Sequence, residues 1–106
     1  MKGAIVMSIL FELGQLVGTA GVAEAMGTHE GFRQFVYKCL ERYITGDWGE
    51  LEEPDKELND ESVAVEGRIL ASYDIPADVG IDYAEKIWII TEWDRSVTTI
   101  LFPDEY

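Results

Sequence analysis

Apolar residues recur at helical spacing in one segment more clearly than anywhere else in this chain. They occupy positions i, i+3, i+4, i+7, i+8, i+11 and i+12, which places all of them on one side of a helix. The members of this stripe are Phe32, Phe35, Val36, Cys39, Leu40, Tyr43 and Ile44. Thr28 is the expected N-cap, and Gly46 the expected left-handed terminator. The pattern predicts an amphipathic helix that packs on a sheet.

Four other segments favour β-strands. Residues 9–17 are mostly apolar, and residues 68–75 alternate between apolar and polar side chains. Residues 86–93 and 97–102 are rich in β-branched and aromatic residues, which favour strands. A tight connection over residues 92–96 predicts that the last two strands form a hairpin.

Two weaker helical signals lie on either side of the amphipathic segment. The small-residue stretch 18–27 predicts one or two helical turns. Residues 54–66 begin with a proline, which suits the first position of a helix, and are strongly acidic. The expected inward stripe of this acidic helix is Leu58, Ser62 and Val65.

The predicted order is strand, helix, helix, strand, strand, strand. It indicates an α+β fold, with an antiparallel sheet of about four strands and helices packed on one face. The 106 residues are expected to form one domain, 1–106. Met7 is an alternative start, which makes an N-terminal tail of residues 1–7 compatible with this division.

The N-terminal apolar run from Ala4 to Phe11 is too short to span a bilayer, and no cleavage site follows it. The single cysteine, Cys39, cannot form an internal disulfide. Both observations lead us to expect a cytoplasmic protein.

Negative charge is concentrated in one part of the chain. The net charge is −13, from 21 acidic and 8 basic residues. Residues 47–66, which we call the acidic belt, contain nine carboxylates and one lysine, a net −8. Such a surface repels phosphates, so direct nucleic-acid binding is not expected. Two interpretations are open: a solvated face that keeps the protein soluble, which is the commoner use of a charge run, or a surface that mimics phosphates and occupies a basic groove of a partner.

The belt supplies the candidate partner-binding residues. The carboxylates are Asp47, Glu50, Glu52, Glu53, Asp55, Glu57, Asp60 and Glu61. Trp48 is the candidate anchor, because an exposed tryptophan rimmed by charge is typical of interface hot spots. The alternative is that Trp48 caps the end of the core. Trp93 has the same two interpretations, whereas Trp88 is expected in the core.

Catalytic and metal-binding signals are weak. The belt carboxylates lack the spacing of a calcium loop, and no cofactor motif or paired Cys/His ligand set occurs, so neither metal nor cofactor is expected. His29, at the start of a predicted helix, fits a surface residue as well as a base, whereas Cys39 is expected to be a packed thiol. Glu92 and Asp94 are the candidates for acid–base work, but a hairpin salt-bridged through Arg95 is the favoured interpretation. We therefore expect no enzymatic activity.

A set of motifs in the C-terminal half resembles a known family. The motifs are Gly46-Asp47-Trp48-Gly49, Asn59, Gly67-Arg68-Ile69-Leu70, Ser72-Tyr73, Lys86-Ile87-Trp88-Ile89-Ile90-Thr91-Glu92, Asp94-Arg95-Ser96-Val97-Thr98-Thr99-Ile100-Leu101, Pro103 and Tyr106. They resemble a family of small bacterial proteins labelled plasmid-related or hypothetical and associated with plasmids and integrative elements. The resemblance runs from about Phe11 onward. This chain departs from it at Trp93, where the family has a small residue, and in a longer 76–85 loop.

The resemblance implies a mobile-element context, although the family carries no established chemistry. Small acidic proteins of such elements are often inhibitors of host defence, including anti-CRISPR and antirestriction proteins. By this analogy the belt engages the nucleic-acid groove of a defence nuclease. A plasmid-maintenance or antitoxin-like module is the alternative, and a small hydrolase that uses Glu92 and Asp94 is the third hypothesis.

Overall fold

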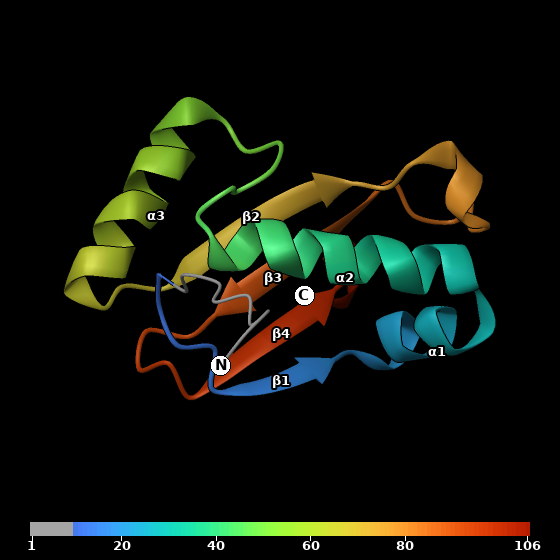
Figure 1. Ribbon diagram of the computed structural model, residues 1–106, viewed down its shortest axis with the longest axis horizontal. Coiled ribbons are helices and arrows are strands. Elements are labelled where there is room, and N and C mark those ends of the chain that lie inside the picture. Colours follow the sequence, from blue (N-terminus) through green and yellow to red (C-terminus); the bar gives the residue numbers. More distant parts are fainter. Residues whose placement is uncertain (1–9) are drawn as a thin grey trace, which may run out of the picture.

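Three α-helices and a four-stranded sheet make up residues 10–106, the part of the chain that the computed structural model describes (Figure 1). The strands are β1 (Gln15–Gly18), β2 (Ile69–Asp74), β3 (Lys86–Thr91) and β4 (Val97–Leu101). The α-helices are α1 (Ala20–Thr28), α2 (Glu30–Ile44) and α3 (Glu53–Val65). Two short 3₁₀ turns are η1 (Ala77–Val79) and η2 (Pro103–Glu105). The predicted α+β class is confirmed.

The sheet is mixed rather than antiparallel. Its strand order is β1-β4-β3-β2; β1 runs parallel to β4, and the other two pairs are antiparallel. The prediction of an antiparallel sheet is therefore wrong at β1. The predicted β3–β4 hairpin is confirmed. It closes through hydrogen bonds from Glu92 N–H to Val97 O and from Arg95 N–H to Glu92 O.

The first strand is shorter than the expected 9–17. Gly14 has φ +63°, and a Cβ at this position would lie 2.3 Å from the carbonyl oxygen of Arg95. The chain therefore turns at Gly14, and extended pairing with β4 begins only at Gln15. Residue 9, the proposed tail and the alternative start at Met7 lie outside the described residues.

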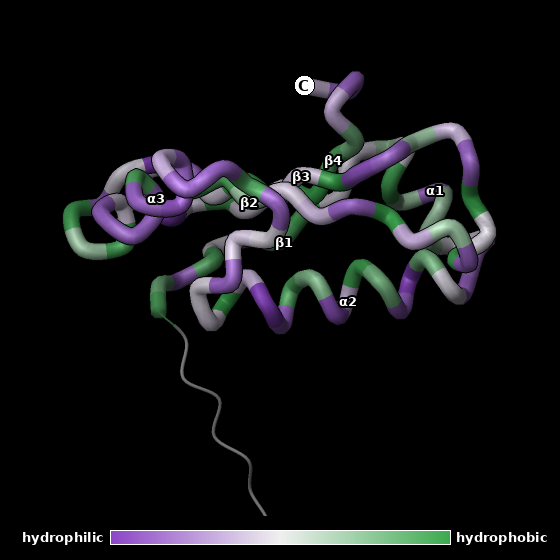
Figure 2. The backbone as a smooth tube through the Cα atoms, turned by 90° about the horizontal axis from the view of Figure 1, so that it is seen from above, coloured by the Kyte–Doolittle hydropathy of each residue, from purple (hydrophilic) through white to green (hydrophobic). Residues whose placement is uncertain are grey.

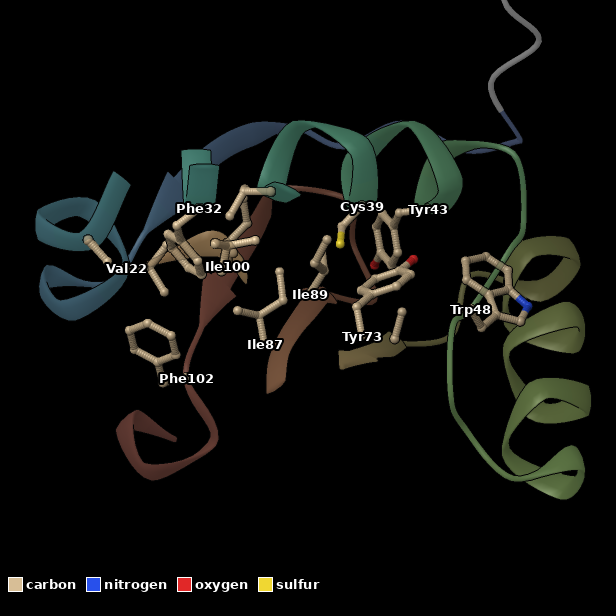
Figure 3. Close-up of a cluster of buried hydrophobic side chains, with 14 of the residues drawn as sticks. Val22, Phe32, Cys39, Tyr43, Trp48, Tyr73, Ile87, Ile89, Ile100 and Phe102 are labelled. Atoms are coloured by element: carbon tan, nitrogen blue, oxygen red, sulfur yellow. The ribbon is translucent and has the colours of Figure 1, made fainter. Parts of the chain in front are cut away.

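The core lies between α1, α2 and one face of the sheet (Figure 3). Phe32, Cys39 and Tyr43 extend from α2 toward the sheet, where Ile89 and Ile100 meet them (Figure 3), and α2 lies over one face of the sheet (Figure 2). The predicted stripe is confirmed for Phe32, Val36, Cys39 and Tyr43, which are buried, whereas Phe35, Leu40 and Ile44 are only partly buried. The prediction that Trp88 belongs to the core is wrong. Trp88 is half-buried outside this core, edge-on to Tyr106 with ring centroids 5.8 Å apart.

Hydroxyl groups inside the core pair with one another. Tyr43 Oη lies 2.7 Å from Thr91 Oγ1, which lies 2.7 Å from Thr98 Oγ1. Thr98 donates in turn to the carbonyl oxygen of Leu13, also at 2.7 Å. This series of hydrogen bonds links α2, β3, β4 and the segment before β1. Each of the three buried hydroxyl groups in it has a hydrogen-bond partner.

The helix boundaries differ in part from the prediction. The small-residue stretch forms a full helix, α1, whose residues Val22 and Ala25 are buried. Because α1 extends to Thr28, the N-cap of α2 is His29, and the prediction of Thr28 is wrong. Gly46 has φ +89° just beyond α2, as expected for a left-handed terminator.

The acidic helix α3 lies beside β2 at the edge of the sheet, not over its face (Figures 1 and 2). The predicted inward stripe is wrong, because Leu58 and Val65 are 59% and 74% exposed. The buried residue of α3 is instead Asn59, which is 5% exposed. The helix thus docks through a polar side chain against the backbone of a strand edge and through Val63, which is partly buried and packed against the core.

The side-chain amide of Asn59 pairs with both backbone groups of Leu70. Asn59 Nδ2 donates to Leu70 O at 2.7 Å, and Leu70 N–H donates to Asn59 Oδ1 at 3.2 Å. Two residues further along β2, Ser72 pairs with the loop before α3: Ser72 N–H donates to Trp48 O, and Glu50 N–H donates to Ser72 O. Leu70 and Ser72 on the outer edge of β2 are therefore paired without a fifth strand, which protects this part of the edge from edge-to-edge association.

We predict that Asn59→Ala lowers the free energy of unfolding by about 1–3 kcal/mol, because Leu70 loses both hydrogen-bond partners. Amide exchange at Leu70 should accelerate in the same variant. Leu58→Ala is the matched control on the same helix; it should change stability by less than about 0.5 kcal/mol, because its side chain is exposed. Chemical denaturation measures both. A larger loss for Leu58→Ala than for Asn59→Ala would contradict polar docking.

Candidate functional site

Four carboxylates form a continuous line along α3. Glu53, Glu57, Asp60 and Glu61 recur at i, i+4, i+7 and i+8, so they share one side of the helix, and all are exposed. We call these four residues the acidic stripe. Lys56, the only basic residue of the belt, lies with its Nζ 3.7 Å from Glu53 Oε1. Both side chains reach solvent, so this pair neutralises little of the stripe.

The charge density along α3 is close to that of a nucleic-acid strand. Seven carboxylates lie between Glu52 and Glu66, and all seven are exposed. At about 1.5 Å of rise per residue this stretch spans about 21 Å, or one charge per roughly 3 Å. One strand of B-DNA carries one phosphate per about 3.4 Å of helix axis. Counted around its whole circumference, α3 therefore carries negative charge at a density close to that of one strand, and four of the seven carboxylates lie on one side as the acidic stripe.

This arrangement works against the stability of the helix. Glu53–Glu57 and Glu57–Glu61 are like-charged i, i+4 pairs, which destabilise helices. Two glutamates, Glu61 and Glu66, also lie near the C-terminal end, where the helix dipole disfavours negative charge, and the last turn has no basic residue.

Arg95 supplies the missing positive charge from the β3–β4 hairpin. Its guanidinium donates to the carbonyl oxygens of Ser62 and Gly67 at 2.7 Å each, at the C-terminal end of α3. It also donates to the carbonyls of Glu92 and Trp93. Arg95 therefore joins the hairpin to the end of α3, a role that its sequence position does not indicate. The structure shows no salt bridge between Arg95 and the hairpin carboxylates, contrary to the prediction.

Trp48 is buried, so it is not an exposed anchor. The residue is 3% exposed, and its ring packs 5.6 Å from the Tyr43 ring and 6.0 Å from the Phe11 ring. Figure 3 shows it between the core and α3. Trp48 Nε1 donates to Asp60 Oδ1 at 2.9 Å. Trp48 thus caps the end of the core, the alternative interpretation, and positions one member of the acidic stripe. Trp93, by contrast, is 63% exposed.

Asp47 is engaged within the chain. Arg42 donates to it through Nε at 2.8 Å and through Nη2 at 3.1 Å, and Gly49 N–H donates to it as well. The hydrogen bond from Arg42 lowers the pKa of Asp47, so the pair stabilises the turn above the ordinary aspartate pKa and loses this effect as the pH falls. Because both partners are partly exposed, the contribution is small.

Most of the predicted partner-binding carboxylates lie on α3. Glu52, Asp55 and the acidic stripe belong to α3 or its N-cap, and Glu50 is exposed on the preceding loop. The structure therefore brings six of the eight predicted carboxylates together on α3: Glu52, Glu53, Asp55, Glu57, Asp60 and Glu61. The other two lie outside α3: Asp47 is bound to Arg42, and Glu50 lies on the loop between Asp47 and α3.

The candidate catalytic carboxylates are each engaged elsewhere. Glu92 Oε1 lies 3.7 Å from Arg68 Nε, and Asp94 accepts from the N–H and hydroxyl of Ser96. His29 Nδ1 lies 2.9 Å from the hydroxyl of Thr28. This geometry gives the hydrolase hypothesis no supporting arrangement. Among residues 10–106, no cluster of three or more His, Cys, Asp or Glu side chains is placed to hold a metal ion.

Comparison of the chain with protein-family models, curated proteins and solved structures finds no match. The resemblance to plasmid-related proteins therefore rests on the quoted motifs alone. Within the described part of the chain, no helix has the length and apolar character needed to cross a membrane.

Burial raises the pKa of the Cys39 thiol to about 12, and the residue is 1% exposed. We therefore predict that Cys39 stays protonated and reacts with a disulfide reagent at pH 8 at least about 100-fold more slowly than a free cysteine of ordinary pKa, about 8.5. Absorbance of the released thiol measures the rate. Protein unfolded in guanidinium chloride is the control and should react at the ordinary rate. Fast reaction of the folded protein would show that Cys39 is accessible.

Proposed function

We propose that this chain is a non-enzymatic, acidic binding protein that places α3 in the nucleic-acid groove of a basic enzyme. The partner class is a nucleic-acid-handling enzyme of host defence, so the protein acts as an inhibitor of the anti-CRISPR or antirestriction type. The observation that carries the proposal is the acidic stripe, Glu53, Glu57, Asp60 and Glu61, exposed on a helix at the edge of the fold.

Two features of α3 support binding over solubility alone. A helix that only needed to be soluble would gain stability from i, i+4 pairs of opposite charge, yet the stripe repeats like charges. The helix is also held by Asn59, by the hydrogen bond from Trp48 to Asp60 and by Arg95, while the carboxylate residues of the stripe remain exposed. A fixed array of charges attracts a complementary groove and raises the rate of encounter with it.

The resemblance to mobile-element proteins supports the choice of partner. Such elements meet restriction and CRISPR nucleases when they enter a cell, and those enzymes hold DNA or RNA in positively charged channels. A protein that fills such a channel competes directly with the nucleic acid. It therefore needs no catalytic group of its own.

The test is inhibition of DNA cleavage by a panel of purified restriction and CRISPR-associated nucleases. We predict that the wild-type protein slows at least one of them, with inhibition that weakens as salt rises. In the triple variant Glu53→Gln, Glu57→Gln, Glu61→Gln, the concentration for half-inhibition should rise roughly tenfold or more, because electrostatic steering is worth a factor of 10 or more in association rate. Asp60 is kept because it holds Trp48.

A second triple variant controls for net charge. Glu12→Gln, Glu24→Gln, Glu41→Gln changes three exposed glutamates outside α3 and also moves the net charge from −13 to −10. It should inhibit like the wild type. Equal inhibition by both triple variants would reject the stripe as the binding surface, and a panel without any inhibited nuclease would reject the proposed partner class.

A further inference from the structure

Two aliphatic side chains of α3 are turned toward solvent. Leu58 is 59% exposed and Val65 is 74% exposed, and their i, i+7 spacing places them on one side of the helix. Glu61 lies three residues after Leu58 and four before Val65, so the acidic stripe borders this apolar pair. A surface that only mimicked phosphates would gain nothing from two exposed aliphatic groups beside its charges.

Leu58 forms one wall of a groove between α3 and β2. The groove has a volume of about 300 Å³ and is lined by Leu51, Asp55, Leu58, Asn59, Arg68 and Leu70. Leu51 and Leu70 are partly buried, so their exposed parts form an apolar floor and wall. A water occupies roughly 30 Å³ of the liquid, so the groove has room for an aliphatic side chain.

The rim of this groove is charged in a way that selects its occupant. Asp55 is exposed at one side, and the acidic stripe continues from Glu61. Arg68 also lines the groove and forms an exposed ion pair with Glu92, whose Oε1 lies 3.7 Å from Arg68 Nε, so Asp55, Arg68 and Glu92 together still carry one negative charge. A second copy of this chain, with net charge −13, would bring further carboxylates to an acidic rim. Charge complementarity therefore favours a basic occupant.

We infer that the partner is a protein that projects an aliphatic side chain from within a basic surface, and that this side chain enters the groove between α3 and β2. Lysine and arginine residues around it then meet the acidic stripe. This inference rests on the proposed function and adds a source of specificity to it. Charge alone attracts many basic surfaces, whereas an apolar contact of defined size distinguishes among them.

The test uses two synthetic peptides as probes. One is a lysine-rich helical peptide with leucines along one side, and the other has the same charge with each leucine replaced by glutamine. We expect the full-length protein to bind the leucine peptide at least about tenfold more tightly, because burying one leucine is worth that factor. Fluorescence anisotropy of labelled peptides at two salt concentrations measures both affinities.

Three variants separate the groove from the stripe. Leu58→Ser with Val65→Ser should abolish the preference for the leucine peptide. The affinity for the glutamine peptide should not change. Tyr37→Ser is the control, since Tyr37 is 51% exposed on α2 away from the groove, and it should keep the preference. The Glu53→Gln, Glu57→Gln, Glu61→Gln variant should bind both peptides more weakly.

Each outcome decides one of the two proposals. Equal binding of both peptides by the wild type, or a preference that survives Leu58→Ser with Val65→Ser, overturns the groove proposal and leaves the stripe standing. Unchanged binding of both peptides by the triple glutamine variant contradicts the proposed function instead. Sedimentation that shows a dimer of the wild type and a monomer of the serine variant would assign the groove to a second copy and also overturn the inference.

Discussion

The side-chain amide of Asn59 holds α3 against the edge of the sheet, and the exposed acidic surface depends on that contact. An amide can satisfy one donor and one acceptor of a strand at once, as a neighbouring strand would. It therefore helps to dock a helix whose inward apolar contact with the core is limited to the partly buried Val63. The bond from Trp48 to Asp60 and those from Arg95 to the end of α3 orient the same helix at two further points. With its docking achieved by these polar groups and by Val63, α3 is free to carry carboxylates and aliphatic groups outward.

The same contacts solve a second problem of the fold. An edge strand with free backbone groups invites pairing with other chains. Asn59 and the loop around Gly49 occupy those groups on β2, and Gly49 allows the close approach, because a Cβ there would lie 2.0 Å from the carbonyl oxygen of Ser72. The acidic belt thus begins with a loop that hydrogen-bonds to the edge strand β2, and it continues into α3, whose carboxylates are exposed. Structural and proposed binding roles fall on different side chains of one segment, except at Asp60, which belongs to the stripe and also accepts from Trp48.

Local patterns were enough to predict the central elements. The stripe of α2 and the β3–β4 hairpin follow from spacing and turn residues within short windows, so both were found. The parallel pairing of β1 with β4 joins residues far apart in sequence, and no local pattern encodes it. The length of α1 was underestimated because its small residues give a weak periodic signal.

The sequence predicts which residues make up the acidic belt, but not how α3 is oriented against the sheet. Charge can be counted along the chain, so the belt was found. The helical pattern predicts an inward side made of Leu58, Ser62 and Val65, because such patterns assume that helices dock through apolar side chains. The residue that decides the orientation of α3 is instead Asn59. Trp48 was placed at the surface as one of two alternatives, since a turn does not reveal what packs over it. Arg95 acts on α3 from a distant hairpin, which only the tertiary structure shows.

The central claim is that the acidic stripe is maintained at a cost to the fold, and stability as a function of salt tests it most directly. In Glu57→Gln with Glu61→Gln, two like-charged i, i+4 contacts disappear while Glu53, Asp60 and the docking contacts remain. The free energy of unfolding at low salt should rise by about 0.5 kcal/mol, and the gain should shrink as salt screens the repulsion. A variant less stable than the wild type at low salt would show that these charges serve the fold itself, and would contradict the account.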